Sequence, residues 1–263
     1  MKFSTLALAA LAAPMIHAAP ANMNVGRDIA TPTETDKNNG KYTGASKLKH
    51  RQQAFRRREL IQPSLYPILQ RYTRFAVASL ATFVYGLGEC ANPPFQSVLV
   101  RKVTNLVTDT QVAIFRDDAA REFVVSFPGT SSIQDFGTDF NFFFMPFDNV
   151  PGCDGCQVHG GVLKGWKSVK EGLVAALGEL RAEKPGYRTV VVGHSLGGGL
   201  ASVAFTDLKA NGVRVDAAYT MGSLRVGNQA YADFTDRLSG ASDTQLGSLI
   251  RITHGIDECG HDV

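Results

Sequence analysis

The pattern of apolar and polar positions predicts strands that alternate with helices from about residue 71 onward. Short apolar runs are typical of strands that are covered on both faces, and longer stretches with apolar residues three and four apart are typical of one helix face. The predicted strands are 97–100, 111–115, 122–127, 189–192, 216–221 and 249–253, and the predicted helices are about 71–87, 162–184 and 196–210. This alternation indicates an α/β domain with a mostly parallel central sheet flanked by helices, whose function lies at the carboxyl ends of the strands.

The first residues have the pattern of a targeting segment rather than of a fold. Lys2 precedes an apolar run over 3–13, and the small residues Ala18 and Ala19 follow. This order predicts a secretory signal peptide over 1–18, with a frayed apolar terminus as the alternative. The run is too short to cross a bilayer, and because no other segment reaches 18 apolar residues we expect no transmembrane segment. The chain is therefore predicted to be secreted and extracellular.

Residues 19–58 have almost no large apolar side chains up to residue 46 and then become strongly basic. Such a stretch buries too little surface to offset its ordering entropy, so we expect a disordered pro-segment that ends at a basic processing site. A solvated tail and a nucleic-acid patch are the alternatives. The net charge is +3, but residues 1–58 hold ten Lys/Arg and three Asp/Glu, so residues 59–263 carry about −4. The folded domain, predicted over 59–263, thus gives no support for a nucleic-acid partner.

The four cysteines are Cys90, Cys153, Cys156 and Cys259. In an oxidising compartment they invite disulfides, for which three pairings exist. The Cys153-Asp-Gly-Cys156 segment has the spacing of half a zinc site or of a redox motif. No second ligand pair lies nearby in sequence, so we predict a local disulfide between Cys153 and Cys156 and no metal.

The segment Gly193-His194-Ser195-Leu196-Gly197 has the pattern G-x-S-x-G between a valine-rich strand and a helix. A serine on a sharp strand-to-helix turn needs glycines two residues to either side, because neighbouring backbone approaches closely there. Its hydroxyl then projects above the sheet edge, and the helix N-terminus favours a negative charge that forms there. We therefore predict Ser195 to be a catalytic nucleophile; the alternative is a glycine-rich packing turn.

Several ordered motifs resemble the secreted fungal class 3 lipases, a family of the α/β-hydrolase fold that includes feruloyl esterases. The resemblance covers about residues 71–257. It rests on Gly193-His194-Ser195-Leu196-Gly197-Gly198, Phe127-Pro128-Gly129-Thr130, Cys153-Asp-Gly-Cys156-Gln-Val-His159-Gly-Gly161, Arg225-Val226-Gly227-Asn228 and Arg251-Ile-Thr-His-Gly-Ile-Asp257. It implies hydrolysis of carboxylic esters by a Ser-Asp-His triad without a cofactor.

The resemblance implies a role for each matching residue. Ser195 is the nucleophile, and Asp257 is the acid that orients the histidine; Asp257 also follows a predicted strand, where a triad acid belongs, although an ordinary loop aspartate is the alternative. The backbone N–H groups of Thr130 and Leu196 form the oxyanion hole, against the alternative that Thr130 belongs to a plain turn. Pro128 stands where family members often carry arginine, so this loop is expected to be supported differently from the same loop in the family.

A lid is expected over 131–144, where phenylalanines are crowded beside two aspartates. We assign Ser131, Ile133 and Phe136 to the lid, a mobile apolar cover that meets a fatty substrate. A buried Phe-rich strand is the alternative, and it fits 141–145 better than 131–137. The apolar Ile133 and Phe136, together with Gly197-Gly198, favour a lipase over a feruloyl esterase.

The catalytic base is the part of the family pattern that we do not find. Of the six histidines, only His261 is a candidate, and it lies two residues from the last one. In the family the catalytic histidine lies much further on, so we predict that the domain is incomplete at its C-terminus. The prediction is a secreted, monomeric triacylglycerol lipase that acts on lipid through an acyl-enzyme and needs no cofactor. The missing histidine leaves open whether this chain itself is active. The alternatives are a feruloyl esterase-like hydrolase and a non-catalytic secreted lipase-fold remnant.

Overall fold

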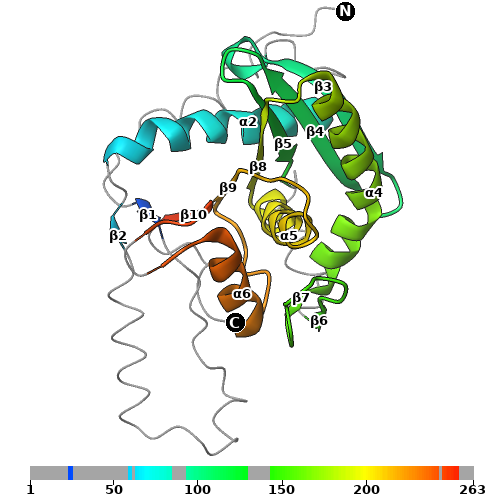
Figure 1. Ribbon diagram of the computed structural model, residues 1–263, viewed down its shortest axis with the longest axis vertical. Helices are drawn as coiled ribbons and strands as arrows, with labels where there is room; N and C mark the ends of the chain where they lie inside the picture. Colours follow the sequence, from blue (N-terminus) through cyan, green and yellow to red (C-terminus); the bar gives the residue numbers. More distant parts are fainter. Residues whose placement is uncertain are drawn as a thin grey trace, which may run out of the picture.

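The computed structural model describes residues 23–25, 59–60, 63–84, 93–129, 143–242 and 245–254 (Figure 1). The strands are β1 Met23–Val25, β2 Glu59–Leu60, β3 Val98–Asn105, β4 Thr110–Asp117, β5 Glu122–Phe127, β6 Phe144–Pro146, β7 Gln157–His159, β8 Arg188–His194, β9 Ala217–Met221 and β10 Leu249–His254. The helices are α2 Tyr66–Val84, α4 Gly160–Glu183, α5 Leu196–Ala210 and α6 Gln229–Ser239, with the short 3₁₀ segments η2 Pro63–Leu65 and η3 Pro94–Gln96.

One sheet organises the fold, with the strand order β2-β1-β10-β9-β8-β5-β4-β3. Its four central strands, β5, β8, β9 and β10, are parallel, and antiparallel strands extend the sheet on both sides. Strands β6 and β7 form a separate antiparallel pair. The predicted parallel sheet with flanking helices is therefore confirmed for its central part.

Helices cover both faces of the sheet (Figure 1). On one face α2 packs Leu69 and Phe75 against Phe115 and Val190 in one apolar cluster. On the other face α4 and α5 build the larger cluster, with the fully buried Trp166 at its centre. Strands β5 and β8 contribute alternate residues to both clusters, which is why their sequences are continuous apolar runs rather than alternating ones.

Several predicted elements differ from the observed ones. Helix α2 begins at Tyr66, earlier than the expected start near 71, and Pro67 in its first turn suits a helix start because the missing N–H has no partner there in any case. Strand β3 runs on to Asn105, because as an edge strand it is exposed on one side and alternates polar residues that interrupt the apolar pattern. Helix α6 was not predicted at all.

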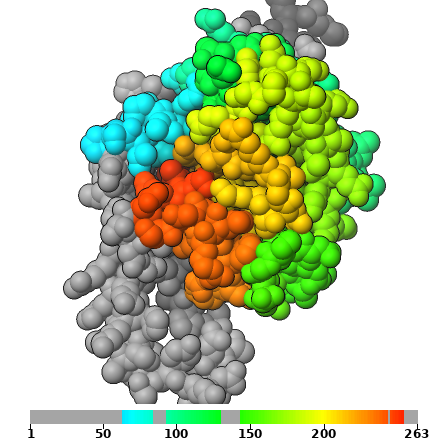
Figure 2. Space-filling view, viewed as in Figure 1, coloured from blue at the N-terminus to red at the C-terminus, as the bar shows by residue number. Residues whose placement is uncertain are grey.

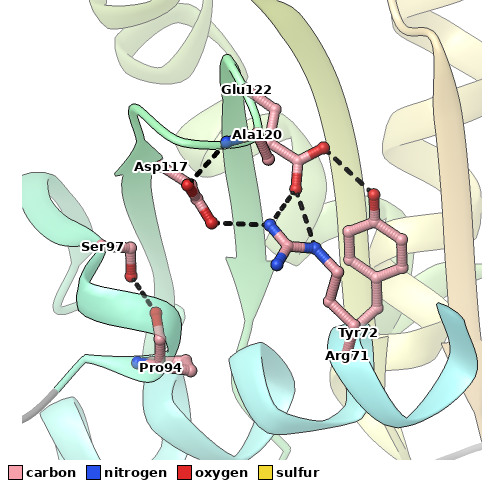
Figure 3. Close-up of polar contacts among 7 residues, drawn as sticks. All are labelled: Arg71, Tyr72, Pro94, Ser97, Asp117, Ala120 and Glu122. Carbon is pink, nitrogen blue, oxygen red and sulfur yellow. Dashed lines mark hydrogen bonds and ion pairs between the residues drawn. The ribbon is translucent and has the colours of Figure 1, made fainter. Parts of the chain in front are cut away.

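A buried ion cluster joins α2 to the turn at which β4 ends and β5 begins (Figure 3). Arg71 donates to Asp117 and Glu122, both at 2.6 Å, and Tyr72 donates to the second oxygen of Glu122 at 3.1 Å. The Ala120 N–H also donates to Asp117, at 2.9 Å. Burial lowers the pKa of Arg71, but the hydrogen bonds to the two carboxylates outweigh it and hold that pKa above its ordinary value. This cluster lies where β5 begins, at the opposite end of that strand from Phe127, and it ties the helix to the sheet.

The predicted boundaries at residues 18 and 58 remain predictions. Strand β1, which pairs with β10, lies within the predicted pro-segment, whereas β2 lies at the start of the predicted domain. Over the described part of the chain, no helix has both the length and the apolar character needed to cross a membrane.

Candidate active site

Ser195 occupies the turn between β8 and α5, with the backbone angles φ 55° and ψ −123°. Such a positive φ is rare for a residue with a side chain and marks a strained, over-determined position. A Cβ on Gly193 would lie 2.0 Å from the carbonyl oxygen of Gly197, and one on Gly197 would lie 2.2 Å from that of Phe127. Both glycines of the motif are therefore required, because a side chain at either position would clash with neighbouring backbone. This confirms the reason for expecting glycine at these two positions.

The loop that follows β5 lies directly against this turn. A Cβ on Gly129 would be 3.6 Å from the Cβ of Ser195 and 3.0 Å from the carbonyl oxygen of His194. On the other side, the Ser195 N–H donates to the carbonyl of Met221 at the end of β9, at 3.0 Å. The turn is thus held between the carboxyl ends of β5 and β9, where the strand order predicts a site.

The N-terminus of α5 begins immediately after Ser195. Leu196 is its first residue, and the N–H groups of Gly198 and Gly199 donate to the Ser195 carbonyl at 3.0 and 3.2 Å. The Ser195 side chain makes no capping hydrogen bond to the helix. The hydroxyl is therefore not used to close the helix end, and it stands at the positive end of the helix dipole.

The loop after β9 supports α5 from the side. A Cβ on Gly198 would lie 2.8 Å from the Cβ of Ser223, and one on Gly199 would lie 2.9 Å from a methyl group of Val226. Arg251 on β10 donates to the Ser223 carbonyl at 2.6 Å. Within the motif from Arg225 to Asn228, Val226 therefore packs against the start of α5, whereas Asn228 caps α6.

Cys153 and Cys156 form a disulfide, as predicted. Asn228 braces the turn that it closes, because its amide donates to the Gly155 carbonyl at 2.9 Å and accepts from the Gln157 N–H at 3.1 Å. Across the described ranges, no group of three His, Cys, Asp or Glu side chains is arranged to hold a metal ion.

His159 ends β7 and is the N-cap of α4, and it is buried, with 2% of its surface exposed. Its Nδ1 accepts from the Val162 N–H at 3.4 Å, so it caps this helix rather than facing Ser195. Burial lowers the pKa of His159 below its ordinary value, which keeps the ring neutral and able to accept.

Other predicted site residues fall outside the described residues. These are Thr130, Asp257 and the lid residues Ser131, Ile133 and Phe136, together with the candidate base His261. The two cysteines outside the disulfide, Cys90 and Cys259, also lie outside the described residues. The first two positions of the expected Phe-rich strand over 141–145 also lie outside the described residues. The strand itself is β6, but its side chains are not buried: Phe144 is 41% and Met145 42% exposed. The expectation of a buried strand is wrong because β6 pairs only with the short β7, away from the central sheet.

The strained serine turn at the carboxyl edge of this sheet defines an α/β-hydrolase. The family described as Lipase (class 3) matches residues 124–259, just over half of the chain. The chain belongs to the class 3 lipase family.

Curated relatives agree with this assignment over part of their length. Secreted mono- and diacylglycerol lipase 1 of Fusarium solani is 36% identical over 173 residues, which are 65% of this chain and 49% of that protein. Secreted mono- and diacylglycerol lipase A of Penicillium camembertii is 36% identical over 152 residues, which are 57% of this chain and 46% of that protein. The chain thus spans about half the length of these relatives.

Solved structures share the fold. A lipase from Rhizopus microsporus var. chinensis superposes with a TM-score of 0.60 at 30% identity, covering 68% of this chain and 64% of that chain. A triacylglycerol lipase from Penicillium expansum has a TM-score of 0.60 at 25% identity, covering 73% of this chain and 70% of that chain.

Proposed function

We propose that the chain is a secreted carboxylic-ester hydrolase of lipase type, in which Ser195 is the nucleophile. The observation that carries the proposal is the Ser195 turn: a side chain free of helix capping, on a strained backbone, at the N-terminus of α5. Strain of this kind persists only where the surroundings impose it, and it is typical of catalytic positions.

The chemistry follows from the position of the turn. The Ser195 Oγ forms a bond to the ester carbonyl carbon and loses its proton to a base, while the carbonyl oxygen becomes an oxyanion. Collapse of this intermediate releases the alcohol with that proton and leaves an acyl-enzyme, which water then hydrolyses to the free acid. The Leu196 N–H, at the start of α5, is suited to stabilise the oxyanion. By the family pattern, the Thr130 N–H would be its second donor.

Two further roles rest on the family pattern. Asp257 would orient the histidine that serves as base, and it follows β10, which lies beside β9 in the sheet. His159 is unsuited to be that base, because its ring nitrogen caps α4. In the family pattern the catalytic histidine lies well beyond Asp257, and His261 is the histidine of this sequence that follows Asp257.

Lipid esters are the proposed substrate class. Phe143, Phe144 and Met145 are 52%, 41% and 42% exposed, and they gather beside the first turn of α4. Exposed apolar surface of this kind suits an apolar substrate better than a phenolic acid on a polysaccharide. The related lipases named as secreted, and the signal-like first residues, support an extracellular location.

Hydrolysis of p-nitrophenyl esters from butyrate to palmitate tests the proposal, with Ser195→Ala as the decisive variant. Loss of a nucleophile removes the covalent route, so we expect the rate to fall at least a thousandfold. The exposed Ser64→Ala, on η2, is the matched serine control and should keep the parent rate. Equal rates for the parent chain and Ser195→Ala would refute the proposal and favour the non-catalytic alternative.

The same assay tests the remaining roles. If His261 is the base, His261→Ala loses as much activity as Ser195→Ala. A preference for long acyl chains over methyl ferulate supports a lipase, and the reverse preference supports the feruloyl esterase alternative.

A further inference from the structure

The turn between β3 and β4 carries two neighbouring apolar side chains in full contact with solvent. Leu106 is 87% and Val107 is 89% exposed, more than any other large apolar side chain that the structure describes. Scattered apolar residues on a surface are ordinary, but two adjacent ones at the tip of a hairpin form a projecting apolar point.

The strand register places this tip at the edge of the sheet where Ser195 lies. Strand β4 is antiparallel to β5, with Ala113 opposite Ser126, so the start of β4 is level with the residues that follow β5. Those residues include Gly129, which contacts the Ser195 turn. Because neighbouring strands are about 4.8 Å apart, the tip lies roughly 10–15 Å to the side of that turn.

The tip is braced, and two of its backbone N–H groups are paired within the turn. The Asn105 side-chain oxygen accepts from the N–H groups of Val107 and Thr108, at 3.0 and 3.1 Å. The Thr108 hydroxyl lies 2.7 Å from the Ser168 hydroxyl on α4, which ties the tip to that helix. An apolar phase penalises unpaired N–H groups, so this internal pairing is what entry of the tip into such a phase requires.

Exposed charges of both signs surround the tip, since Asp109 lies in the turn itself and two lysines lie nearby on α4. On α4, Lys164 lies one turn before Ser168, and Lys167 directly precedes Ser168. Both lysines are exposed and lie on the part of the helix nearer its start. Glu171 lies one turn further away. The exposed side chains of β6 lie at the start of the same helix, since the Gly160 N–H donates to the Phe143 carbonyl at 3.0 Å. In Figure 2 the β6–β7 pair stands out as a green knob beside α6.

We propose that the β3–β4 turn is an anchor that inserts Leu106 and Val107 into the surface of a lipid particle. The anchor brings the sheet edge that holds Ser195 to that surface, with Lys164 and Lys167 placed to meet lipid headgroups beside it. This inference rests on the proposed function in so far as lipid esters are the substrate. It concerns an element separate from the lid segment and from the catalytic residues.

Binding measured without turnover separates the anchor from catalysis. All variants carry Ser195→Ala, and partition of the full chain onto vesicles of phosphatidylcholine with one third phosphatidylglycerol is followed by flotation. We expect the double variant Leu106→Ser with Val107→Ser to lose at least tenfold in the partition coefficient. Val98→Ser, at the other end of β3 and 47% exposed, is the matched control and should change it less than twofold.

Two further readouts complete the test. With Ser195 restored, the double variant should keep its kcat on a water-soluble short ester and show a raised KM on emulsified triglyceride. Sedimentation of the vesicle-free chain shows whether the turn instead joins two copies. Equal loss in the double variant and in Val98→Ser would overturn the proposal, and so would loss of a dimer in place of vesicle binding. A chain that binds vesicles through Leu106 and Val107 but hydrolyses no ester would refute the proposed function alone.

Discussion

The glycines around Ser195 make the sharpest test of how the site is built, and Gly193→Ala is the most informative change. Its new methyl group would lie 2.0 Å from the Gly197 carbonyl oxygen and 2.7 Å from the Gly198 nitrogen. Real contacts of this kind are essentially never shorter than 3.0 Å, so the backbone must part by about 1 Å or more. The opposing atoms belong to the backbone at the start of α5 and not to a flexible side chain.

The cost follows from this geometry. Overpacking that forces backbone shifts costs typically about 1–3 kcal/mol, and contact with backbone on a helix start places Gly193→Ala at the upper end, about 3 kcal/mol. The same shift displaces Ser195, so ester hydrolysis should be lost together with stability.

Equilibrium unfolding in urea measures the change. The chain has one tryptophan, Trp166, and it is fully buried, so its fluorescence reports the state of the core. The matched control is Gly178→Ala on the exposed side of α4, where an added Cβ meets nothing within 4 Å. That variant should gain about 0.5–1 kcal/mol, because glycine is a poor helix former. A Gly193→Ala protein as stable as the parent chain would refute the argument from contact.

Three further outcomes are expected of the packing and electrostatics. Arg71→Met should lower the free energy of unfolding by about 3–5 kcal/mol, because Asp117 and Glu122 would stay buried without their partner; paired denaturation curves measure it. Since the pKa of His159 is lowered by burial, the folded state binds its proton less readily than the unfolded state, and stability should fall as the pH drops below about 6.5. His159→Asn, which keeps a capping acceptor, should flatten that pH dependence when unfolding is repeated from pH 7 to pH 5. Reduction of the Cys153–Cys156 disulfide should cost about 2 kcal/mol, the loop entropy of so short a ring, and melting with and without reductant tests this.

The serine turn could be predicted from sequence because its requirement is local. Gly193 and Gly197 flank Ser195 within five residues, and the strand and helix on either side have unmistakable apolar patterns. The disulfide between Cys153 and Cys156 was equally accessible, since a short ring needs no knowledge of the rest of the fold.

Other features depend on residues far apart in sequence. Arg71 meets Asp117 and Glu122 across 46 and 51 residues, and nothing local marks any of the three as buried. Helix α6 was overlooked although a signal exists: Asn228 caps it and Gly240 ends it with a φ of 78°. The exposure of β6 reflects its lack of a partner in the central sheet, which composition alone does not reveal.

The hydrogen bond from the Ser195 N–H to the Met221 carbonyl has a consequence for the order of folding. The nucleophile turn is completed only when β9 has paired with β8, and it also packs on the loop after β5, more than sixty residues earlier. Contacts of such long sequence separation form slowly, because loop-closure entropy is lost before they contribute. We therefore expect helices α4 and α5 to form early, and the geometry at Ser195 to form later, together with the pairing of β8 with β5 and β9.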